Sequence, residues 1–239
     1  DWDFSSVRHW GEAAEGIWTL SITDVSAGVS GTFHSATLTL YGTDVSPLPQ
    51  ITSVSSTPQL LRSGDPLTLT CDGTGGGRVA YIWSRNGSNV SGNAKTHFIP
   101  AVSMAHAGSY RATAYNGGGS GASADIPVGV LGIQPVATAV NQAGSLNLTV
   151  SAAGPGLLYQ WKLNGVALGN GPKLGGGSIA GADASALSIT NMQAEDAGAY
   201  TCLVSLPGAA QSLETTATGV TVTFKPTVST PTFGNGVRG

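Results

Sequence analysis

Short runs in which apolar and polar residues alternate recur along most of this chain. The clearest examples lie at residues 37–42, 67–71, 146–150, 186–189 and 219–224. Leucine, valine, isoleucine and threonine dominate these runs, and clusters of Gly, Asn and Ser separate them. Alternation with a period of two residues is the pattern of a half-buried β-strand. The only heptad-like stretch, residues 194–199, is short and contains a glycine. The sequence therefore predicts an all-β protein.

One sequence block occurs twice in the last two-thirds of the chain. Tyr81–Gly87 and Tyr159–Gly165 both read Tyr-x-Trp-x-x-Asn-Gly. Alternation places the Tyr and the Trp on one face of a strand, and Asn-Gly closes a tight hairpin because both central residues of a type I′ turn need positive φ. An alternating strand lies upstream of each Trp and contains Cys71 in the first copy and Val150 in the second.

A second block repeats with a constant spacing of 90 residues. Val102–Ala112 matches Met192–Cys202, so that Gly108 corresponds to Gly198, Tyr110 to Tyr200 and Ala112 to Cys202. Trp83 and Trp161 are only 78 residues apart. The second copy therefore carries 12 additional residues, which we assign to the glycine-rich stretch Leu168–Ala184.

Both copies resemble immunoglobulin-like domains. The family signature is a strand with an inward Cys, a Trp about a dozen residues later, and Asp-x-Gly-x-Tyr-x-Cys further on. The second copy carries Asp196, Tyr200 and Cys202, and the first has His106, Tyr110 and Ala112 at these positions. The resemblance implies two tandem β-sandwiches, with Trp83 and Trp161 in the interiors and each tyrosine in a corner hydrogen bond to the backbone.

The resemblance also implies that Cys71 faces Ala112 and that Cys202 faces Val150. Each domain then holds one half of a bridge. Two cysteines in separate cores cannot reach the roughly 4.4–6.8 Å between Cα atoms that a disulfide needs. We therefore predict two free, buried thiols that behave as small apolar residues. An intermolecular bridge and a different strand register are the alternatives, and the cysteine number alone would have suggested one disulfide.

The first 44 residues do not fit the repeat. They contain three of the five tryptophans and alternating stretches at residues 17–25 and 32–42. They resemble the C-terminal third of the P domain, the β jelly-roll that follows the catalytic domain in subtilisin-like proprotein convertases and many secreted bacterial proteases. The principal matching residues are Trp10, Gly11, Glu12, Trp18, Asp24 and Gly31.

Two departures from the P-domain pattern bear on cofactors. Ala36 stands where the family usually has Trp, and Val29 replaces an acidic residue that is sometimes linked to calcium. We therefore predict no calcium site here and no other cofactor. Because most of a P domain would precede Asp1, we expect this piece to pack on the next domain, to pair with another chain, or to lack order.

Composition shifts along the chain give its predicted organisation. We expect a P-domain fragment over 1–44, a short proline-containing linker over 45–50, immunoglobulin-like domains over 51–130 and 131–225, and a Pro/Thr/Gly tail over 226–239. The two immunoglobulin-like domains follow each other with almost no linker between them, which predicts a semi-rigid pair.

Charge and hydropathy exclude several classes of function. Only 10% of the residues are charged and the net charge is −3, which gives no footprint for nucleic acid. No apolar stretch approaches the roughly 18 residues of a membrane span. We therefore predict neither nucleic-acid binding nor membrane insertion. Abundant small residues with few charges are typical of secreted or cell-surface β-modules.

The candidate catalytic features all fail on context. Ser103-Met104-Ala105 matches the Ser-Met-Ala of the subtilisin nucleophile turn, but Ala101-Val102 precedes it in place of Gly-Thr, and no helix is expected after it. The four histidines have no metal-ligand spacing. His97 aligns with inward-facing Leu187 and is predicted to be half-buried, and Asp196 is predicted to form a structural ion pair. Glycine runs such as 175–177 lack the Lys and helix of a phosphate loop and are predicted to be flexible turns. No catalytic, cofactor-binding or metal-binding residue is predicted.

The leading functional hypothesis is a non-catalytic accessory segment of a large secreted or surface bacterial protein. Its parent would be a subtilisin-like serine protease with the catalytic domain upstream, and its role would be spacing, stabilisation or weak adhesion. The alternative is a dedicated adhesin that binds an extracellular protein or glycan through the loops Tyr115–Gly121 or Leu168–Ala184, although these are poor in the aromatic residues and Arg of binding hot spots. A third hypothesis, that the segment is itself a protease, predicts peptide hydrolysis by the isolated chain.

Overall fold

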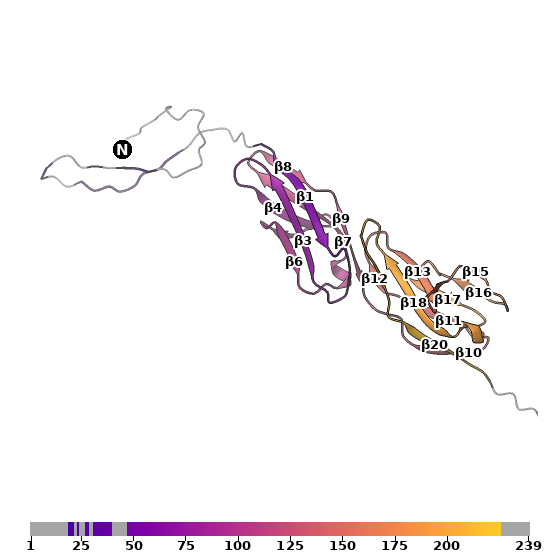
Figure 1. Ribbon diagram of the computed structural model, residues 1–239. Helices are drawn as coiled ribbons and strands as arrows, with labels where there is room; N and C mark the ends of the chain where they lie inside the picture. The colour runs from indigo at the N-terminus through magenta and orange to yellow at the C-terminus, as the bar shows by residue number, and fades with distance from the viewer. Residues whose placement is uncertain (1–18, 22, 24–26, 29–30, 40–46, 226–239) are drawn as a thin grey trace, which may run out of the picture. The chain divides into compact units, whose positions relative to one another are not determined.

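A computed structural model describes residues 19–21, 23, 27–28, 31–39 and 47–225 of the chain. Contacts within the chain separate Asp1–Val45 from Ser46–Gly239. The second of these units contains two β-sandwiches (Figure 1), which confirms the predicted all-β class with tandem immunoglobulin-like sandwiches.

The first sandwich consists of two sheets that face each other. One sheet has the strand order β1-β3-β6, and the other has β12-β9-β7-β4-β5, with β2 paired to β9 and β8 to β7. The edge strand β12 (Ala152–Ala153) comes from the second copy of the repeat. The elements are β1 Gln50–Thr57, β2 Leu60–Arg62, β3 Leu67–Thr74, β4 Ala80–Arg85, β5 Ser88–Gly92, β6 Thr96–Ile99, the 3₁₀ turn η1 Met104–His106, β7 Gly108–Asn116, β8 Gly119–Ala122 and β9 Ile126–Leu131.

The second sandwich repeats this plan with more strands. Its sheets have the orders β10-β20-β18-β13-β14, with β19 paired to β18, and β11-β17-β16-β15. The elements are β10 Thr138–Asn141, β11 Leu146–Thr149, β12 Ala152–Ala153, β13 Leu158–Leu163, β14 Val166–Ala167, β15 Gly171–Pro172, β16 Ser178–Ala180, β17 Ala186–Ile189, the 3₁₀ turn η2 Ala194–Asp196, β18 Gly198–Ser205, β19 Ser212–Glu214 and β20 Thr218–Thr223.

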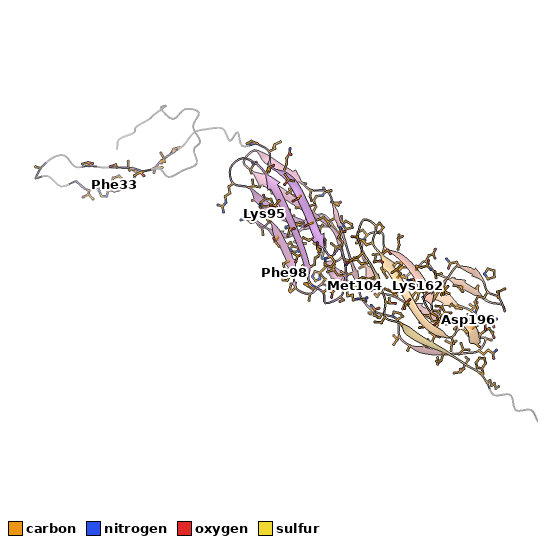
Figure 2. All side chains as sticks on the ribbon, in the orientation of Figure 1. Phe33, Lys95, Phe98, Met104, Lys162 and Asp196 are labelled. Atoms are coloured by element: carbon orange, nitrogen blue, oxygen red, sulfur yellow. The ribbon has the colours of Figure 1, made fainter. Side chains whose placement is uncertain are left out.

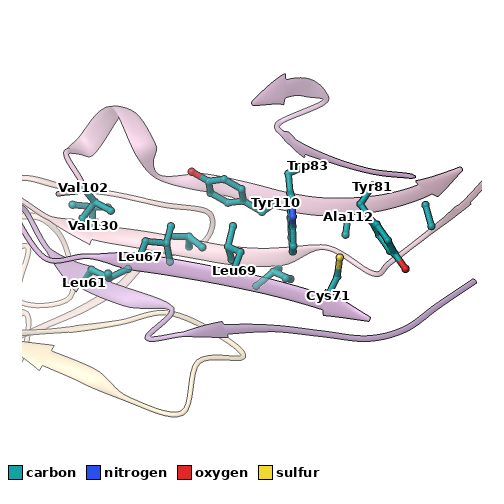
Figure 3. Packing of buried hydrophobic residues seen from close by; sticks show 13 residues of the cluster. Leu61, Leu67, Leu69, Cys71, Tyr81, Trp83, Val102, Tyr110, Ala112 and Val130 are labelled. Atoms are coloured by element: carbon teal, nitrogen blue, oxygen red, sulfur yellow. The ribbon is translucent and has the colours of Figure 1, made fainter. Parts of the chain in front are cut away.

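Alternation along the strands builds one apolar core in each sandwich. In β3, Leu67, Leu69 and Cys71 point inward while the residues between them are more exposed, as a period of two requires. Figure 3 shows Cys71, Trp83, Tyr110 and Ala112 converging in the first core. The core of the second sandwich is separate and contains Trp161, Tyr200 and Cys202 among others. Trp83 and Trp161 are both fully buried, at 0% exposure.

The predicted strands of the two sandwiches match the structure within three residues, whereas the described residues of the N-terminal segment carry no strand. The alternating runs at 67–71, 146–150, 186–189 and 219–224 become β3, β11, β17 and β20. In the N-terminal segment, the described residues 19–21, 23 and 31–39 are exposed and carry no strand. Strand pairing is what defines a β-strand, and alternation alone does not supply a partner. The remaining residues of the predicted strands at 17–25 and 32–42 lie outside the described residues.

The described part of the predicted linker is attached to the first sandwich. The backbone carbonyl of Pro47 accepts hydrogen bonds from the Asn116 side chain at 2.7 Å and from the Gly76 N–H at 3.5 Å. Pro49 is buried, and β1 begins at Gln50. Residues 47–50 are therefore attached to the folded domain at both ends, through the Pro47 carbonyl and through the pairing of Gln50 with Thr74.

Candidate functional site: strand corners and the insertion of the second sandwich

A tyrosine closes the corner before β7 and β18 in the two sandwiches. The Tyr110 hydroxyl donates to the His106 carbonyl oxygen at 2.8 Å, and the Tyr200 hydroxyl donates to the Asp196 carbonyl oxygen at 2.7 Å. Burial, and then the Asp196 carboxylate, raise the pKa of Tyr200. Both hydroxyls therefore act as neutral structural donors.

Asp196 forms the most deeply buried ion pair among the described residues. Its carboxylate contacts the Lys173 ammonium and accepts the Gln193 N–H at 2.7 Å. The side chains of Lys173 and Asp196 are only 7% and 10% exposed. The Lys173 ammonium also donates to the carbonyl of Asn191 at 3.3 Å. The structure thus contains the predicted ion pair, and its cation comes from the Leu168–Ala184 insertion. Figure 2 labels Asp196 in the second sandwich.

The insertion folds into two short strands that extend a sheet. β15 and β16 pair with each other, and β16 pairs with β17. The Asn170 side chain accepts the Ala182 N–H and donates to Asp183, each at 2.8 Å. The Trp161 indole N–H donates to the Ala184 carbonyl at 2.8 Å, so the insertion is tied directly to the core.

The tip of the insertion is a turn, as predicted for this glycine run. Gly175, Gly176 and Gly177 have φ of 88°, 94° and 81°, a region that favours glycine. The Lys173 N–H donates to the Gly177 carbonyl at 3.0 Å. A Cβ on Gly177 would lie 2.3 Å from the Thr190 carbonyl oxygen. Leu174 is 95% exposed at this tip.

The repeated asparagines have a role that the sequence did not reveal. Asn86 Oδ1 accepts the Ser109 N–H at 2.8 Å, and Asn164 Oδ1 accepts the Ala199 N–H at 2.9 Å. Each hairpin turn therefore also fixes the start of the strand that carries the corner tyrosine. A Cβ on Gly198 would lie 2.6 Å from that Asn164 oxygen, which explains why the glycine recurs. Two features of the sequence could have indicated this role: the 90-residue spacing between the repeated blocks and the recurrence of Asn-Gly in both copies.

The two cysteines are free and buried, as the repeat predicts. Cys71 lies in the same core cluster as Ala112, and Cys202 lies in the same cluster as Val150. Burial is the largest cause that raises the pKa of both thiols, and the pKa of Cys202 reaches about 11. A thiol that stays protonated is a poor nucleophile and a poor metal ligand.

Ser103 and His106 form a hydrogen-bonded pair that is structural. The Ser103 N–H donates to His106 Nδ1 at 2.9 Å, and the His106 N–H returns a bond to the Ser103 carbonyl, also at 2.9 Å. Ser103 Oγ lies 3.1 Å from the same Nδ1. This nitrogen already accepts a backbone N–H, so it is not a free base for the hydroxyl. His106 caps the turn in the place that Asp196 occupies in the second sandwich.

The other candidate residues are dispersed. His97 is half-buried, with its ring centroid 6.0 Å from that of Tyr110. No group of three metal-ligating side chains occurs in the described part of the chain. In the other candidate loop, Tyr115 is 39% exposed at the end of β7, and Asn116 ties the hairpin to residues 47 and 76. A hollow of about 280 Å³ is lined by Asn86, Ala107, Gly108, Ala153, Gly154 and Pro155, none of which titrates.

Of the six principal residues that match the P domain, five lie outside the described residues. Gly31 is the one exception; it is exposed, and a Cβ there would meet open space. The geometry of Trp10, Gly11, Glu12, Trp18 and Asp24 is therefore not described. Across the described residues, no helix has the length and hydropathy of a membrane span.

Residues 47–225 thus form a tandem pair of β-sandwiches, and family models give the relationships of the chain. Residues 48–130 and 129–205 each match a model described as an immunoglobulin domain. Residues 1–40 match the proprotein convertase P-domain. The chain therefore carries a P-domain segment followed by two immunoglobulin-like domains.

Curated relatives match only the N-terminal part of the chain. "Endoprotease bli" of Onchocerca volvulus is 52% identical over 44 residues, which are 18% of this chain and 6% of the relative. "Dibasic-processing endoprotease" of Schizosaccharomyces pombe is 44% identical over 48 residues, 20% of this chain and 7% of the relative. "Endoprotease bli-4" of Caenorhabditis elegans is 48% identical over 44 residues, 18% of this chain and 5% of the relative. These relatives are eukaryotic, and the chain spans only a small part of their length.

Solved structures of tandem immunoglobulin domains resemble the chain at low identity. A titin tandem has 18% identity and a TM-score of 0.39, covering 75% of this chain and 99% of its own. Immunoglobulin domains 1–4 of Sidekick-1 have 20% identity and a TM-score of 0.38, covering 76% of this chain and 49% of their own.

Proposed function

We propose that this chain is a non-catalytic accessory region of a secreted or cell-surface subtilisin-like serine protease whose catalytic domain lies upstream in the same polypeptide. The observation that carries the proposal is the order of segments, because a sequence that matches endoproteases at its P-domain part continues directly into two immunoglobulin-like domains. The described residues offer folded sandwiches and no assembled nucleophile and base. Their role in the proposal is to space and stabilise the protease. A bacterial source also remains a proposal, supported by the low cysteine use; the eukaryotic relatives do not support it.

The absence of catalysis is tested with a serine-directed fluorophosphonate probe and quenched peptides. We expect the isolated chain to remain unlabelled and to hydrolyse none of the peptides, while a protein that contains the upstream catalytic domain is labelled. Labelling of the isolated chain that is lost in Ser103→Ala would contradict the proposal.

The spacer role is tested by removing residues 46–225 from the complete protease. We expect kcat/KM for a short soluble peptide to stay unchanged, because those residues do not contribute to the catalytic centre. Cleavage of a substrate fixed to a surface should fall, because the reach of the catalytic domain changes. Equal effects on both substrates would contradict a spacer.

Adhesion is the second candidate, favoured by the insertion tip. Leu174 is 95% exposed on a turn that the Lys173–Asp196 pair holds in place, and a pre-organised apolar tip lowers the entropic cost of binding. The test is a screen of extracellular glycans and proteins with the intact chain and Leu174→Ser. Saturable binding at about micromolar affinity or tighter, lost in Leu174→Ser and kept in Val166→Ser, would favour adhesion. Val166 is 70% exposed and serves as a matched control outside the insertion.

A further inference from the structure

Strand β9 lies between segments of both sandwiches. On one edge it pairs in parallel with β2 of the first sandwich, where Leu60 is opposite Gly129 and Arg62 is opposite Leu131. On the other edge it pairs with β12, where Ala152 is opposite Leu131 and Ala153 is opposite Val130. The short strand β12 belongs to the second copy by sequence, yet it completes a sheet of the first.

The side chains of β9 are divided between the two cores. Val128 and Val130 are fully buried in the first core, and Leu131 is fully buried in the second. The next residue is also fixed, because the Gly132 N–H donates to the Ser151 carbonyl at 2.7 Å and the Ser151 N–H donates to the Ile133 carbonyl at 3.1 Å. Ser151 therefore holds the backbone of both Gly132 and Ile133 directly after β9.

Polar side chains connect the sandwiches outside this strand. The Arg62 guanidinium donates to the Glu214 carbonyl at 2.7 Å, and the Gln211 amide donates to the Leu60 carbonyl at 3.0 Å. Ser151 Oγ donates to the Met104 sulfur at 3.4 Å. Figure 2 shows Met104 where the two sandwiches meet.

Glycines allow the backbones to approach at this joint. A Cβ on Gly129 would lie 2.8 Å from Leu60 Cδ1 and 3.3 Å from Leu157 Cδ2, that is, between the two sandwiches. A Cβ on Gly154 would lie 2.8 Å from the Cα of Gly129. Such distances are below ordinary van der Waals contact, so larger residues would force the two surfaces apart.

From this joint we infer that the two immunoglobulin-like domains unfold as one cooperative unit, with the second domain serving as the structural partner that completes the first. Unfolding the second domain would remove β12 from β9 and expose Leu131, Leu60 and the carbonyls that Arg62 and Gln211 bind. The first domain would then lose the pairing partner of Val130 and Leu131 at the end of β9, while β7 would still pair with Ile126–Val128. The inference deepens the proposed spacer role, because a fixed joint transmits orientation, but it does not require a parent protease.

The experiment measures hydrogen exchange by mass spectrometry in the full chain. Leu187→Ala truncates the core of the second domain, in β17, which is not a joint element. We expect exchange in β3 of the first domain, Leu67–Thr74, to rise at least tenfold, because both domains open together. Leu69→Ala in the first core should raise exchange in β17 in the same way. If Leu187→Ala prevents folding, Ile189→Val supplies a milder truncation in the same strand.

A bulky substitution at the joint distinguishes coupling between the two domains from general destabilisation of the chain. Gly129→Val should abolish the transfer of the Leu187→Ala effect to β3 and split a single calorimetric transition into two. Gly92→Val and Gly219→Val are matched controls, because a Cβ at either glycine has no neighbour within 4 Å. Unchanged exchange in β3 with Leu187→Ala, or two transitions in the unaltered chain, would overturn the inference. Because no protease activity is measured, that failure is distinguishable from a failure of the proposed function.

Discussion

At the residue scale, the two sandwiches differ in whether the indole N–H of the buried tryptophan has a hydrogen-bond partner. Trp161 donates its indole N–H to the Ala184 carbonyl of the insertion. Trp83 Nε1 is buried with no hydrogen-bond partner in the described structure. The first copy is shorter by the residues that form this contact in the second. An unpaired buried donor costs free energy because it has lost its bonds to water.

Replacing each tryptophan by phenylalanine should therefore have unequal effects. Both changes reduce packing to a similar degree, but Trp161→Phe also leaves the Ala184 carbonyl without its donor, whereas Trp83→Phe removes an unsatisfied one. We expect Trp161→Phe to lower the free energy of unfolding by at least about 1 kcal/mol more than Trp83→Phe. Urea unfolding followed by far-ultraviolet circular dichroism measures the difference. Equal losses would show that Trp83 Nε1 is satisfied, for example by a buried water.

His97 makes stability depend on pH. Burial is the main cause that lowers its pKa from the ordinary value of 6.5, and electrostatic interaction with the nearby His106 and Arg85 side chains lowers it further. As the pH falls below 6.5, the His97 imidazole becomes protonated in the unfolded chain before it does so in the folded chain. The free energy of unfolding should therefore fall as the pH drops from 6.5 towards the lower pKa of the folded state.

The control for this prediction comes from the repeat. His97→Leu copies Leu187 of the second sandwich and should flatten the slope of stability between pH 7 and 5. His34→Leu, at an exposed histidine, should leave the slope unchanged. Glu214, whose pKa is lowered by Thr201 and Lys162, loses its contribution only below its ordinary 4.5, which lies outside the pH range of this test. An unaltered slope in His97→Leu would contradict the assignment.

At the scale of elements, the insertion shows how a segment without a strong pattern becomes ordered. The strands β15 and β16 have two and three residues, too few for alternation to identify. Their order comes from Lys173, Asn170 and the left-handed glycines at the tip. A long lysine side chain loses considerable rotamer freedom when it is fixed, and the buried contact with Asp196 offsets that cost only while both charges are present.

Lys173→Met should therefore be strongly destabilising. It leaves the Asp196 carboxylate buried without a cation, at a cost of about 3–5 kcal/mol. The double variant Lys173→Met with Asp196→Asn should lose less than Lys173→Met alone, because no buried charge remains. Urea unfolding of the two singles and the double gives the coupling energy between the side chains. A loss below about 0.5 kcal/mol for Lys173→Met, the size of an ordinary surface substitution, would mean that the carboxylate is solvated.

At the scale of the whole molecule, each sandwich is stable with half of the sulfur bridge that the family resemblance implies. The thiols of Cys71 and Cys202 lie in different cores, so they cannot replace that bridge by pairing with each other. Apolar burial around Trp83 and Trp161, the corner hydrogen bonds and the shared strand β9 supply the cohesion in this structure.

Restoring the missing cysteine in each sandwich should allow a disulfide to form in its core. In Ala112→Cys we expect a disulfide with Cys71, one remaining free thiol at Cys202, and a gain of about 3–4 kcal/mol for a loop of this size. Val150→Cys should pair with Cys202 in the same way. Thiol titration under denaturing, non-reducing conditions and urea unfolding give both readouts. Thr113→Cys, one residue further along β7 and on the opposite face, should keep three free thiols, and a fully reduced Ala112→Cys chain would refute the facing geometry.

Local patterns in the sequence determined the strands of the sandwiches and the two-copy organisation, because alternation and turn chemistry act between residues close in the chain. The buried tryptophans and the free thiols followed from the resemblance to immunoglobulin-like domains. The local patterns also over-predicted: the described residues near Thr37 alternate but carry no strand, since alternation cannot supply a pairing partner. Only the tertiary structure decided that Lys173 is the cation for Asp196, that Asn86 and Asn164 fix the next strand, and that β12 completes a sheet of the other sandwich. Those contacts join residues far apart in sequence, and the fold determines which such groups meet.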